Sequence, residues 1–424
     1  MYYRTLFVIA LFAVSAFAQS SEMSLDEAVK YALANNKSLQ AERKQIDVAN
    51  GRLKQAGLRA NPMLEASGLS SVADTSMRAA AVLVRLPLEA GGRRLRRIEV
   101  AERELERMKY EVAERERELA AKVRTKYGET VEAMRILELN ERLLELNQNS
   151  YHLIQARVTE GASAPLEQSQ MQVEVGKIEA NKQANVSRVA VLLEELKSLL
   201  GLGSEEQLKV RNEFSEIPVT MSRQELLALA FKTRPDLQAA HAAEAVTAAL
   251  IDQAKTEGKY DMSIFAELGR QAFSFDQFGV NRDSGQPERV AMGSNTARIG
   301  VSITLPTRNK NQGNIEAAVA LNDEARLRRE FIETIIRREV AAAYVRYEGA
   351  QRVLKIYNTD LLVAAQNNLR VMRASFDLGH VRLTEVLNEQ RRLIDLQMTH
   401  TAAQKEYFSA RIELENVVGT ALEK

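Results

Sequence analysis

The sequence contains no cysteine and no tryptophan, and its 424 residues include only 4 histidines. Without cysteine the chain forms no disulfide, no thiolate nucleophile, no cysteine-ligated zinc site and no lipidated N-terminal cysteine. The histidines are scattered, and no nucleophile–base set, metal-ligand spacing or phosphate-binding loop occurs. We therefore expect no catalytic residue, no metal site and no cofactor, and we do not expect an enzyme.

The chain also lacks an excess of charge of one sign and has few residues that interrupt regular structure. Its 58 Lys+Arg and 57 Asp+Glu give a formal charge of +1, which offers no electrostatic case for nucleic acid as a partner. Only 7 Pro and 20 Gly indicate long regular elements with few turns. A composition that is 45% hydrophobic and 27% charged is typical of a folded protein.

The first 18 residues have the three parts of a secretory signal peptide. Arg4 supplies the positive charge, residues 6–14 form an apolar run, and Ala16-Phe17-Ala18 is a small-x-small cleavage site. We predict cleavage after Ala18. The apolar run is too short for a stable membrane anchor, and no later stretch is long and apolar enough for a transmembrane helix. We expect an exported chain without a membrane-spanning helix.

The remaining sequence is a tandem repeat. Ser24 and Glu27 have the spacing of a helix capping box, and the same spacing recurs 198 positions later at Ser222 and Glu225. Gln55 and Gln253 have the same offset of 198. The pairs that follow, in the same order, have an offset of about 217 to 219: Leu86 with Leu305, Tyr127 with Tyr344, Gly161 with Gly379, Glu167 with Glu385, and Leu200 with Val418. The change of offset places one insertion between Gly269 and Thr296.

Each repeat is predicted to run as a short helix, a second helix, two strands and a long helical hairpin. We divide the chain into a first repeat (19–203), a linker (204–221) and a second repeat (222–424). Strands are predicted near 61–70, 80–88, 259–268 and 297–305, and the hairpins at 93–200 and 314–418.

The hairpins begin with very long helices. Residues 93–158 contain no proline and one glycine, and their apolar residues recur at steps of three and four. This narrow stripe is typical of coiled coils. About 65 residues at 1.5 Å per residue give a rod of roughly 100 Å, which needs parallel neighbours along its length. Residues 314–377 repeat the pattern as a second rod.

The predicted strands alternate between apolar and polar or small residues. In 297–305, Ile299, Val301 and Ile303 alternate with Gly300, Ser302 and Thr304. Period-two alternation fits membrane barrel strands, and it also fits a soluble half-buried sheet. Export without a membrane helix favours the barrel, and a sheet in lipid must close on itself. Four strands are too few to close a membrane barrel, so several copies of the chain must contribute. Two copies would give eight strands with a filled interior, and three copies would give twelve strands with a lumen. The small polar residues on the inner face favour the twelve-stranded barrel.

The duplicated unit and its two tip motifs resemble the TolC-type outer-membrane efflux proteins. The second tip carries Phe376-Asp377-Leu378-Gly379 followed by Glu385-Val386-Leu387, and the first carries Gly161 followed by Pro165-Leu166-Glu167. The resemblance implies a mainly α-helical homotrimer with a twelve-stranded barrel in the outer membrane and a helical tunnel through the periplasm. Its tips would meet a periplasmic adaptor protein, which joins them to an inner-membrane transporter.

The resemblance also implies roles for individual tip residues. The inward-facing acidic position of the family falls on Glu385, while a second acidic position falls on Asn388, next to Glu389. The basic latch position falls on Val381, with Arg382 beside it. The candidate gate residues are Glu385, Asn388, Glu389, Glu167 and Arg382, and the candidate adaptor contacts and tip turns are Gly161, Gly379, Leu383 and Leu166.

The predicted function is a passive trimeric conduit across the outer membrane and periplasm for metal ions or drugs delivered by an inner-membrane pump. Two alternatives are a periplasmic coiled-coil adaptor or scaffold and an outer-membrane duct for type I protein secretion. We expect the insertion at 269–295, with three phenylalanines, to form the longer extracellular loop.

Overall fold

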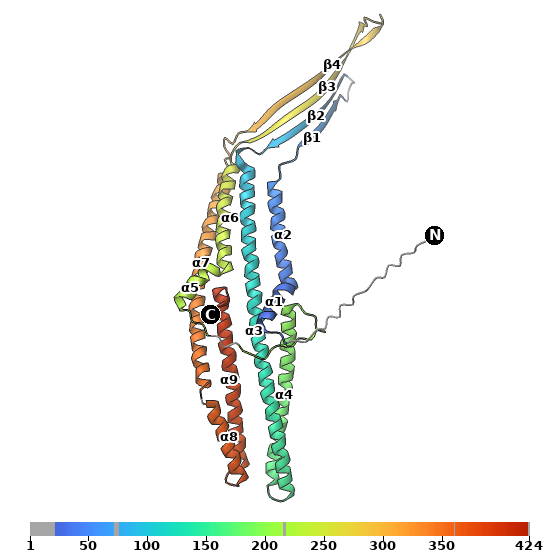
Figure 1. The fold of residues 1–424 in the computed structure, drawn as a ribbon. Coiled ribbons are helices and arrows are strands. Elements are labelled where there is room, and N and C mark those ends of the chain that lie inside the picture. Colours follow the sequence, from blue (N-terminus) through green and yellow to red (C-terminus); the bar gives the residue numbers. More distant parts are fainter. Residues whose placement is uncertain (1–21, 72–75, 215–217, 360, 423–424) are drawn as a thin grey trace, which may run out of the picture.

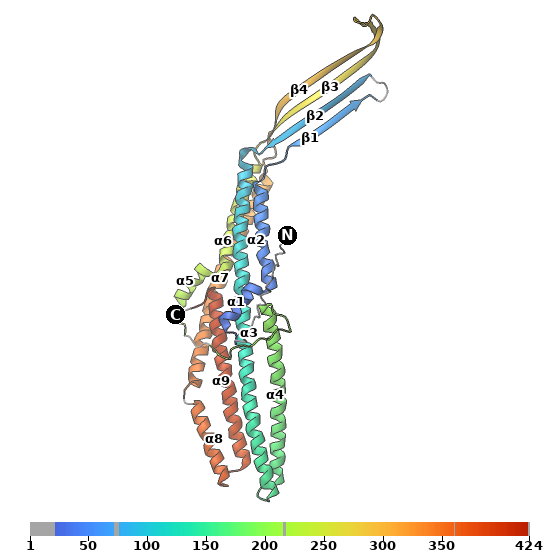
Figure 2. The same ribbon diagram turned by 45° about the vertical axis from the view of Figure 1, so that its right-hand side comes forward.

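The computed structural model describes residues 22–71, 76–214, 218–359 and 361–422. The predicted signal peptide and its cleavage site after Ala18 lie outside the described residues. The molecule is elongated, with one sheet at one end and bundled helices running from it to two hairpin tips at the other end (Figures 1 and 2). Within the described residues, none of the helices has the length and apolar composition of a membrane span.

Both repeats contain the same order of elements, and this confirms the predicted duplication. The first comprises α1 (Leu25–Asn35), α2 (Lys37–Gly57), β1 (Met63–Ser70), β2 (Met77–Leu88), a short 3₁₀ turn (Ala90–Gly92), α3 (Arg93–Thr159) and α4 (Pro165–Leu200). The second comprises α5 (Arg223–Thr233), α6 (Pro235–Glu257), β3 (Asp261–Val280), β4 (Pro287–Thr304), α7 (Gln312–Tyr357), α8 (Leu361–Asp377) and α9 (Leu383–Val418).

The short helices α1 and α5 begin with the expected capping boxes. The hydroxyl of Ser24 accepts from the backbone N–H of Glu27, whose carboxylate accepts from the Ser24 backbone, and Ser222 and Glu225 repeat this arrangement. The returning helices α4 and α9 end at Gly201 and Gly419, both at positive φ. A helix C-terminus closed by a left-handed glycine satisfies carbonyls of its last turn.

The residue after each short helix ties it to the returning helix. In the first repeat, Asn36 donates from Nδ2 to the carbonyl of Leu199 at 2.9 Å. In the second, Arg234 donates from Nη1 to the carbonyl of Val417 at 3.2 Å. Two different side chains at equivalent positions therefore satisfy equivalent carbonyls that would otherwise lack helical partners.

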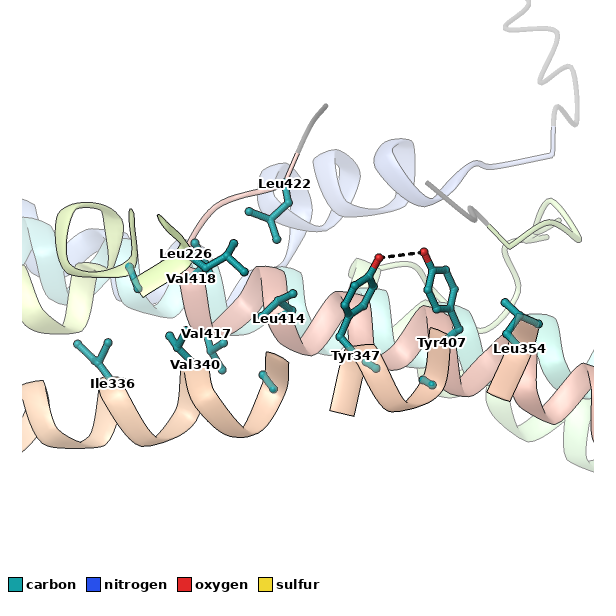
Figure 3. Close-up of a cluster of buried hydrophobic side chains, with 14 of the residues drawn as sticks. Leu226, Ile336, Val340, Tyr347, Leu354, Tyr407, Leu414, Val417, Val418 and Leu422 are labelled. Atoms are coloured by element: carbon teal, nitrogen blue, oxygen red, sulfur yellow. Dashed lines mark hydrogen bonds between the residues drawn. The ribbon is translucent and has the colours of Figure 1, made fainter. Parts of the chain in front are cut away.

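Two hydrophobic cores lie half-way along the molecule, one in each repeat. The first gathers Ala28 and Ala32 of α1, Val123 of α3 and Leu200 of α4. In the second, Leu226 of α5, Val340 of α7 and Val418 of α9 occupy the same places (Figure 3). These cores hold the short helices against the long ones.

A buried tyrosine in each core fixes the inter-repeat segments. The hydroxyl of Tyr127 donates to the carbonyls of Met23 and Arg211 at 3.1 and 3.0 Å, and burial raises the pKa of Tyr127 to about 12. In the second repeat the backbone N–H of Val219 donates to the hydroxyl of Tyr347 at 2.7 Å. Tyr344, which the repeat pattern in the sequence pairs with Tyr127, is only partly buried and packs at the edge of this core.

The helix α3 is continuous over 67 residues, or about 100 Å, as predicted. The second rod is not continuous, because α7 ends at Tyr357 and α8 begins at Leu361. The side chain of Thr359 donates to the carbonyl of Ile356 at 2.5 Å, and that of Asn358 bonds to His400 at 2.8 Å. The Thr359 hydroxyl competes for a backbone carbonyl at the end of α7, and Asn358 is held by a side chain of α9; together they account for the break, which apolar periodicity did not predict.

The four strands form one antiparallel sheet in the order β1-β2-β3-β4. The register pairs Leu64 with Val84, Val84 with Ala266, and Ala266 with Ile299. Because residues on one face recur with period two, the apolar sets of all four strands lie on the same face. Glu267 and Arg298, which form an ion pair, and the predicted inner residues Ser302 and Thr304 lie on the other face. The ring of Phe265 covers Gly300 there.

The predicted loop at 269–295 is wrong: the segment extends the β3–β4 hairpin. The ladder continues from Gly269 paired with Thr296 to Val280 paired with Pro287, with a register shift between Ser274 and Phe278. Only residues 281–286 form the turn. Each strand supplies backbone hydrogen-bond partners for the other as far as the turn, so pairing continues past the predicted ends of these strands. The hairpin projects beyond β1 and β2, at the end far from the helices (Figure 1).

Arginines at the start of α3 join the sheet to the helices. Arg94 and Arg97 donate to the carbonyls of Gly57 and Ala56, at the end of α2, at 2.8 and 2.9 Å. Arg93 donates to the carbonyl of Lys259, between α6 and β3, at 2.7 Å. Basic side chains satisfy the free carbonyls of helix C-termini and interact favourably with the helix dipole.

Candidate functional site at the hairpin tips

The two hairpin turns have the same backbone geometry. Gly161 and Gly379 have φ values of 74° and 76°. After α3, the N–H of Ala162 donates to the carbonyl of Arg157 at 2.7 Å; after α8, the N–H of His380 donates to that of Ser375 at 2.9 Å. This Schellman arrangement explains why both turns carry glycine.

We predict that Gly379→Ala destabilises the second tip locally by about 1 kcal/mol, because an L-residue at positive φ is strained. A Cβ at this position would touch nothing within 4 Å, so the cost is confined to the backbone. Hydrogen exchange of the tip amides should become faster. Gly176→Ala is the matched control: its Cβ also meets nothing, but it lies inside α4, where alanine is favoured by about 1 kcal/mol. Equal protection in both variants would contradict the assignment.

A small hydrophobic core joins the two hairpins at the tips. Ile154 of α3, Met171 of α4, and Leu383 and Leu387 of α9 form it, with Phe376 of α8 packed against it. The guanidinium of Arg157 lies 5.3 Å from the ring centre of Phe376. Leu383 is only 4% exposed, so its side chain supports the tip from within and is not an accessible contact surface.

The candidate gate residues differ in exposure. Glu385 and Asn388 are both exposed and lie one turn apart on α9, and Arg382 is exposed just before the helix begins. Glu389 is largely covered and pairs with Arg392 at 3.4 Å. Glu167 is half-buried in the first turn of α4. The structure therefore places Glu385 and Asn388 together on a solvent-facing surface, and it separates Glu389 and Glu167 from them.

Two leucines form the exposed apolar part of the tips. Leu166, beside the first turn, is 66% exposed, and Leu378, before Gly379 in the second turn, is 73% exposed. Leu166 is a predicted contact residue, whereas Leu378 belongs to the tip motif without a predicted role of its own. Each turn therefore presents one exposed large apolar side chain.

The structure shows a link between the hairpins that the sequence did not reveal. Arg391 of α9 donates from Nε and Nη2 to the two carboxylate oxygens of Glu174 of α4, at 3.2 and 2.5 Å. The hydrogen bonds to Glu174 raise the pKa of Arg391. These residues lie 217 positions apart, which matches the repeat offset, so nearly equivalent positions of the two returning helices meet here. Neither residue breaks the apolar pattern, so periodicity could not identify them.

Buried polar side chains form a second feature that the sequence reasoning missed. Asn140 and Asn147 are buried in α3 and donate to the carbonyls of Ile136 and Leu143, one turn earlier, at 2.8 Å each. Gln390 of α9 is also buried, and within the described residues its Nε2 has no hydrogen-bond partner. The seven-residue spacing of the asparagines in a heptad pattern was the available signal, since a polar residue in such a seam specifies register at a cost in stability.

The charged groups of the described residues include no cluster of three or more Asp, Glu or His side chains suited to a metal ion. The features of the tips in the described structure are the polar surface at Glu385 and Asn388, the small core that joins the hairpins, and the ion pair between Arg391 and Glu174.

The two repeats each match a known protein family. The match covers residues 28–202 and 226–420, and the family is that of outer membrane efflux proteins. The chain belongs to the outer membrane efflux protein family. The two matched segments correspond to the two structural repeats, each with its short helix, strand pair and hairpin.

Similar proteins include a metal resistance protein and two outer-membrane proteins of known structure. The cobalt-zinc-cadmium resistance protein CzcC of Cupriavidus metallidurans is 22% identical over 399 residues, covering 94% of this chain and 90% of CzcC. The outer membrane protein VceC of Vibrio cholerae superimposes with a TM-score of 0.71 at 20% identity, covering 94% of this chain and 97% of VceC. The open state of the MtrE outer membrane channel of Neisseria gonorrhoeae gives 0.74 at 17% identity, covering 94% and 89%. The efflux-protein fold thus extends over nearly the whole chain.

Proposed function

We propose that this chain is the outer-membrane channel of a tripartite efflux system, a passive conduit for substrates that an inner-membrane pump delivers. The observation that carries the proposal is the strand register, which places the apolar residues of all four strands on one face. Ile299, in the middle of that face, is 83% exposed, and such a surface fits lipid better than water. Family membership supports the same function, and the conduit requires no catalysis.

The sheet favours a homotrimer. Within the described residues, β1 and β4 each lack a partner on their outer edge. Unpaired backbone groups are costly in lipid, and four strands are fewer than the smallest membrane barrels contain. Three copies provide twelve strands and a lumen lined by the polar face. Exposed apolar side chains on α7, such as Leu327 and Phe331, would be covered by a neighbouring copy.

The helical tips would form the mouth of the conduit and contact a periplasmic adaptor. Leu166 and Leu378 offer apolar anchors beside Gly161 and Gly379, which shape the turns. In a trimer, Glu385 and Asn388 are each present three times at this mouth. Rings of carboxylates at a constriction set cation preference in pores, so we assign Glu385 to such a ring. Glu167 and Arg382 flank the mouth in this proposal, and Glu389 supports it through Arg392.

We predict that Glu385→Gln lowers the affinity of blocking divalent cations for the reconstituted channel roughly tenfold, because three carboxylates are removed at once. Single-channel recordings with and without added divalent cation measure the effect. Glu389→Gln is the matched control: this carboxylate lies on the same helix but is largely covered and paired with Arg392, so a smaller change is expected. Unchanged block in Glu385→Gln would remove Glu385 from the constriction.

The fold argues against the alternative of an adaptor or scaffold. Each repeat contains one strand pair and one hairpin, and each repeat matches the efflux-protein family separately. A duct for type I protein secretion would share this architecture. Growth in the presence of metal salts or drugs, compared between a deletion strain and a complemented strain, tests the efflux proposal: the deletion strain is expected to be more sensitive. Unaltered sensitivity together with a lost secreted protein would support the secretion duct instead.

A further inference from the structure

Two arginines end the apolar face of the sheet on the side away from the helices. On this face of β3, Met262, Ile264, Ala266 and Leu268 are followed by Arg270. On β2, Leu86, Val84 and Val82 are followed by Ala80 and then by Arg78. Both arginines are exposed. The apolar band therefore changes directly into positive charge.

The register places the two guanidinium-bearing residues close together. Arg270 is paired with Ala80, and Arg78 is paired with Ala272, so the arginines are diagonal neighbours on one face. Such neighbours have Cα atoms about 7–8 Å apart, within reach of long side chains. Like charges at this spacing repel each other unless an anion lies between them.

The chain supplies no anion to this pair within its described residues. The surrounding positions on the same face are Ser70 on β1, Ala272 on β3, and Gly293 and Asn295 on β4. The next carboxylate along β3, Asp276, lies 3.5 Å from Arg289 and is paired with it. Neither Arg78 nor Arg270 forms a salt bridge in the described structure, although most other arginines of this chain pair with a carboxylate or a carbonyl.

The position of the pair matches the thickness of a membrane. From Asp261, where β3 begins, to Arg270 is 9 residues along the strand. At about 3.3 Å per residue this is about 30 Å, and a strand tilt of about 40° reduces it to about 23 Å along the barrel axis. The lipid-facing band of such barrels is about 25 Å tall. Exposed basic residues, Lys259, Arg308 and Lys310, lie at the other end of the band.

We propose that Arg78 and Arg270 together bind the phosphate group of a membrane lipid headgroup in the leaflet far from the helices. The inference rests on the proposed function, because it requires the apolar face to lie in lipid. A guanidinium presents two parallel N–H donors that match phosphate oxygens, and two guanidiniums can hold one phosphate from both sides. The apolar residues below the pair would contact the acyl chains of the same lipid. The site fixes the depth of the barrel in the membrane.

The absence of tryptophan from the sequence allows a direct test. Leu268→Trp places a single indole one layer below Arg270, at a position that is 69% exposed on the lipid-facing side. The full-length variant is reconstituted into phosphatidylcholine vesicles in which a tenth of the lipid is brominated phosphatidylglycerol or brominated phosphatidylcholine. Bromine quenches indole fluorescence only on contact. The ratio of the two quenching efficiencies reports local enrichment of the anionic lipid.

We expect brominated phosphatidylglycerol to quench about 5- to 10-fold more effectively than brominated phosphatidylcholine, since basic residues at a membrane surface attract anionic lipid. Adding Arg78→Gln and Arg270→Gln should bring the ratio to about one. Arg85→Gln is the matched control: it lies on β2 but on the opposite face, paired with Phe265, and should retain the preference.

Three results would overturn the proposal: equal quenching by both lipids with the arginines intact, a preference that survives the double substitution, or loss of the preference in Arg85→Gln. Inorganic phosphate that abolishes the preference, where chloride of the same ionic strength does not, would show that the site takes a free anion and would also overturn it. Failure of the proposed function is distinguishable, because an indole outside the bilayer would be quenched by neither brominated lipid.

Discussion

Ile299→Arg is expected to prevent stable assembly of the protein in the outer membrane. Ile299 lies in the middle of the apolar face, with Val301 and Ile303 beyond it on the same strand. An arginine on the lipid face near the bilayer midplane costs about 2–4 kcal/mol, and a trimer would carry three of them. The fraction of heat-sensitive trimer in purified outer membranes measures the effect, and we expect it to fall by more than tenfold.

Ser302→Arg is the matched control for this substitution. Ser302 lies three residues further along β4, on the opposite, polar face, paired with Ser263. An arginine there would face the lumen, so trimers should form and the channel conductance should change. If both variants assembled equally well, or if Ser302→Arg were the one that failed, the assignment of the two faces would be wrong.

Arg234→Met is expected to destabilise the helical region strongly. Arg234 is 4% exposed and lies 2.6 Å from carboxylate oxygens of both Asp236 and Glu339. It also satisfies the carbonyl of Val417. Removing the cation leaves these groups without a partner, and breaking a buried pair typically costs 3–5 kcal/mol. Because the carboxylates are partly exposed, we expect about 2–3 kcal/mol in denaturant unfolding.

The control for this prediction is Arg43→Met, which breaks the ion pair between Arg43 and Glu116. Their side chains are 40% and 36% exposed, and such surface pairs contribute about 0–1 kcal/mol. A loss in Arg234→Met no larger than in Arg43→Met would contradict the structural role of the buried cluster.

The buried cluster also predicts a pH dependence. Burial alone would raise the pKa of Asp236, but the hydrogen bonds and charge of Arg234 outweigh it, so the pKa of Asp236 lies below its ordinary value. Between the folded-state and unfolded-state pKa values of Asp236, the unfolded chain therefore binds more protons than the folded one. The stabilisation that is present above a pH of about 4 is lost as the pH falls through the folded-state pKa. The difference in unfolding free energy between wild type and Arg234→Met should shrink on acidification from about pH 5 to pH 3.

Local sequence patterns predicted the repeat and most of its elements. The capping boxes at Ser24 and Ser222 and the turn glycines Gly161 and Gly379 are short-range features, in which the residues that determine the geometry lie within a few positions of each other. The alternation in residues 297–305 predicted which side chains share a face of the sheet, because a strand has a strict period of two. These features depend little on the rest of the chain.

The features that were missed depend on distant parts of the chain. The extension of β3 to Val280 requires β4 as its partner, and its own residues, including Gly279 and three phenylalanines, do not specify strand or loop. The break after Tyr357 involves a bond to His400 in another helix. The pairing of Glu174 with Arg391 joins two helices that are far apart in sequence, and the burial of Leu383 depends on Ile154 and Met171 in the other hairpin.

We propose that the four strands of each chain are one third of a membrane barrel. The most direct test is the mass of the purified mature protein, measured by native mass spectrometry after release from detergent micelles, together with its behaviour when detergent is removed. We predict a complex of three chains that stays dispersed only in detergent or lipid. A single chain that remains monodisperse in detergent-free buffer would contradict the account.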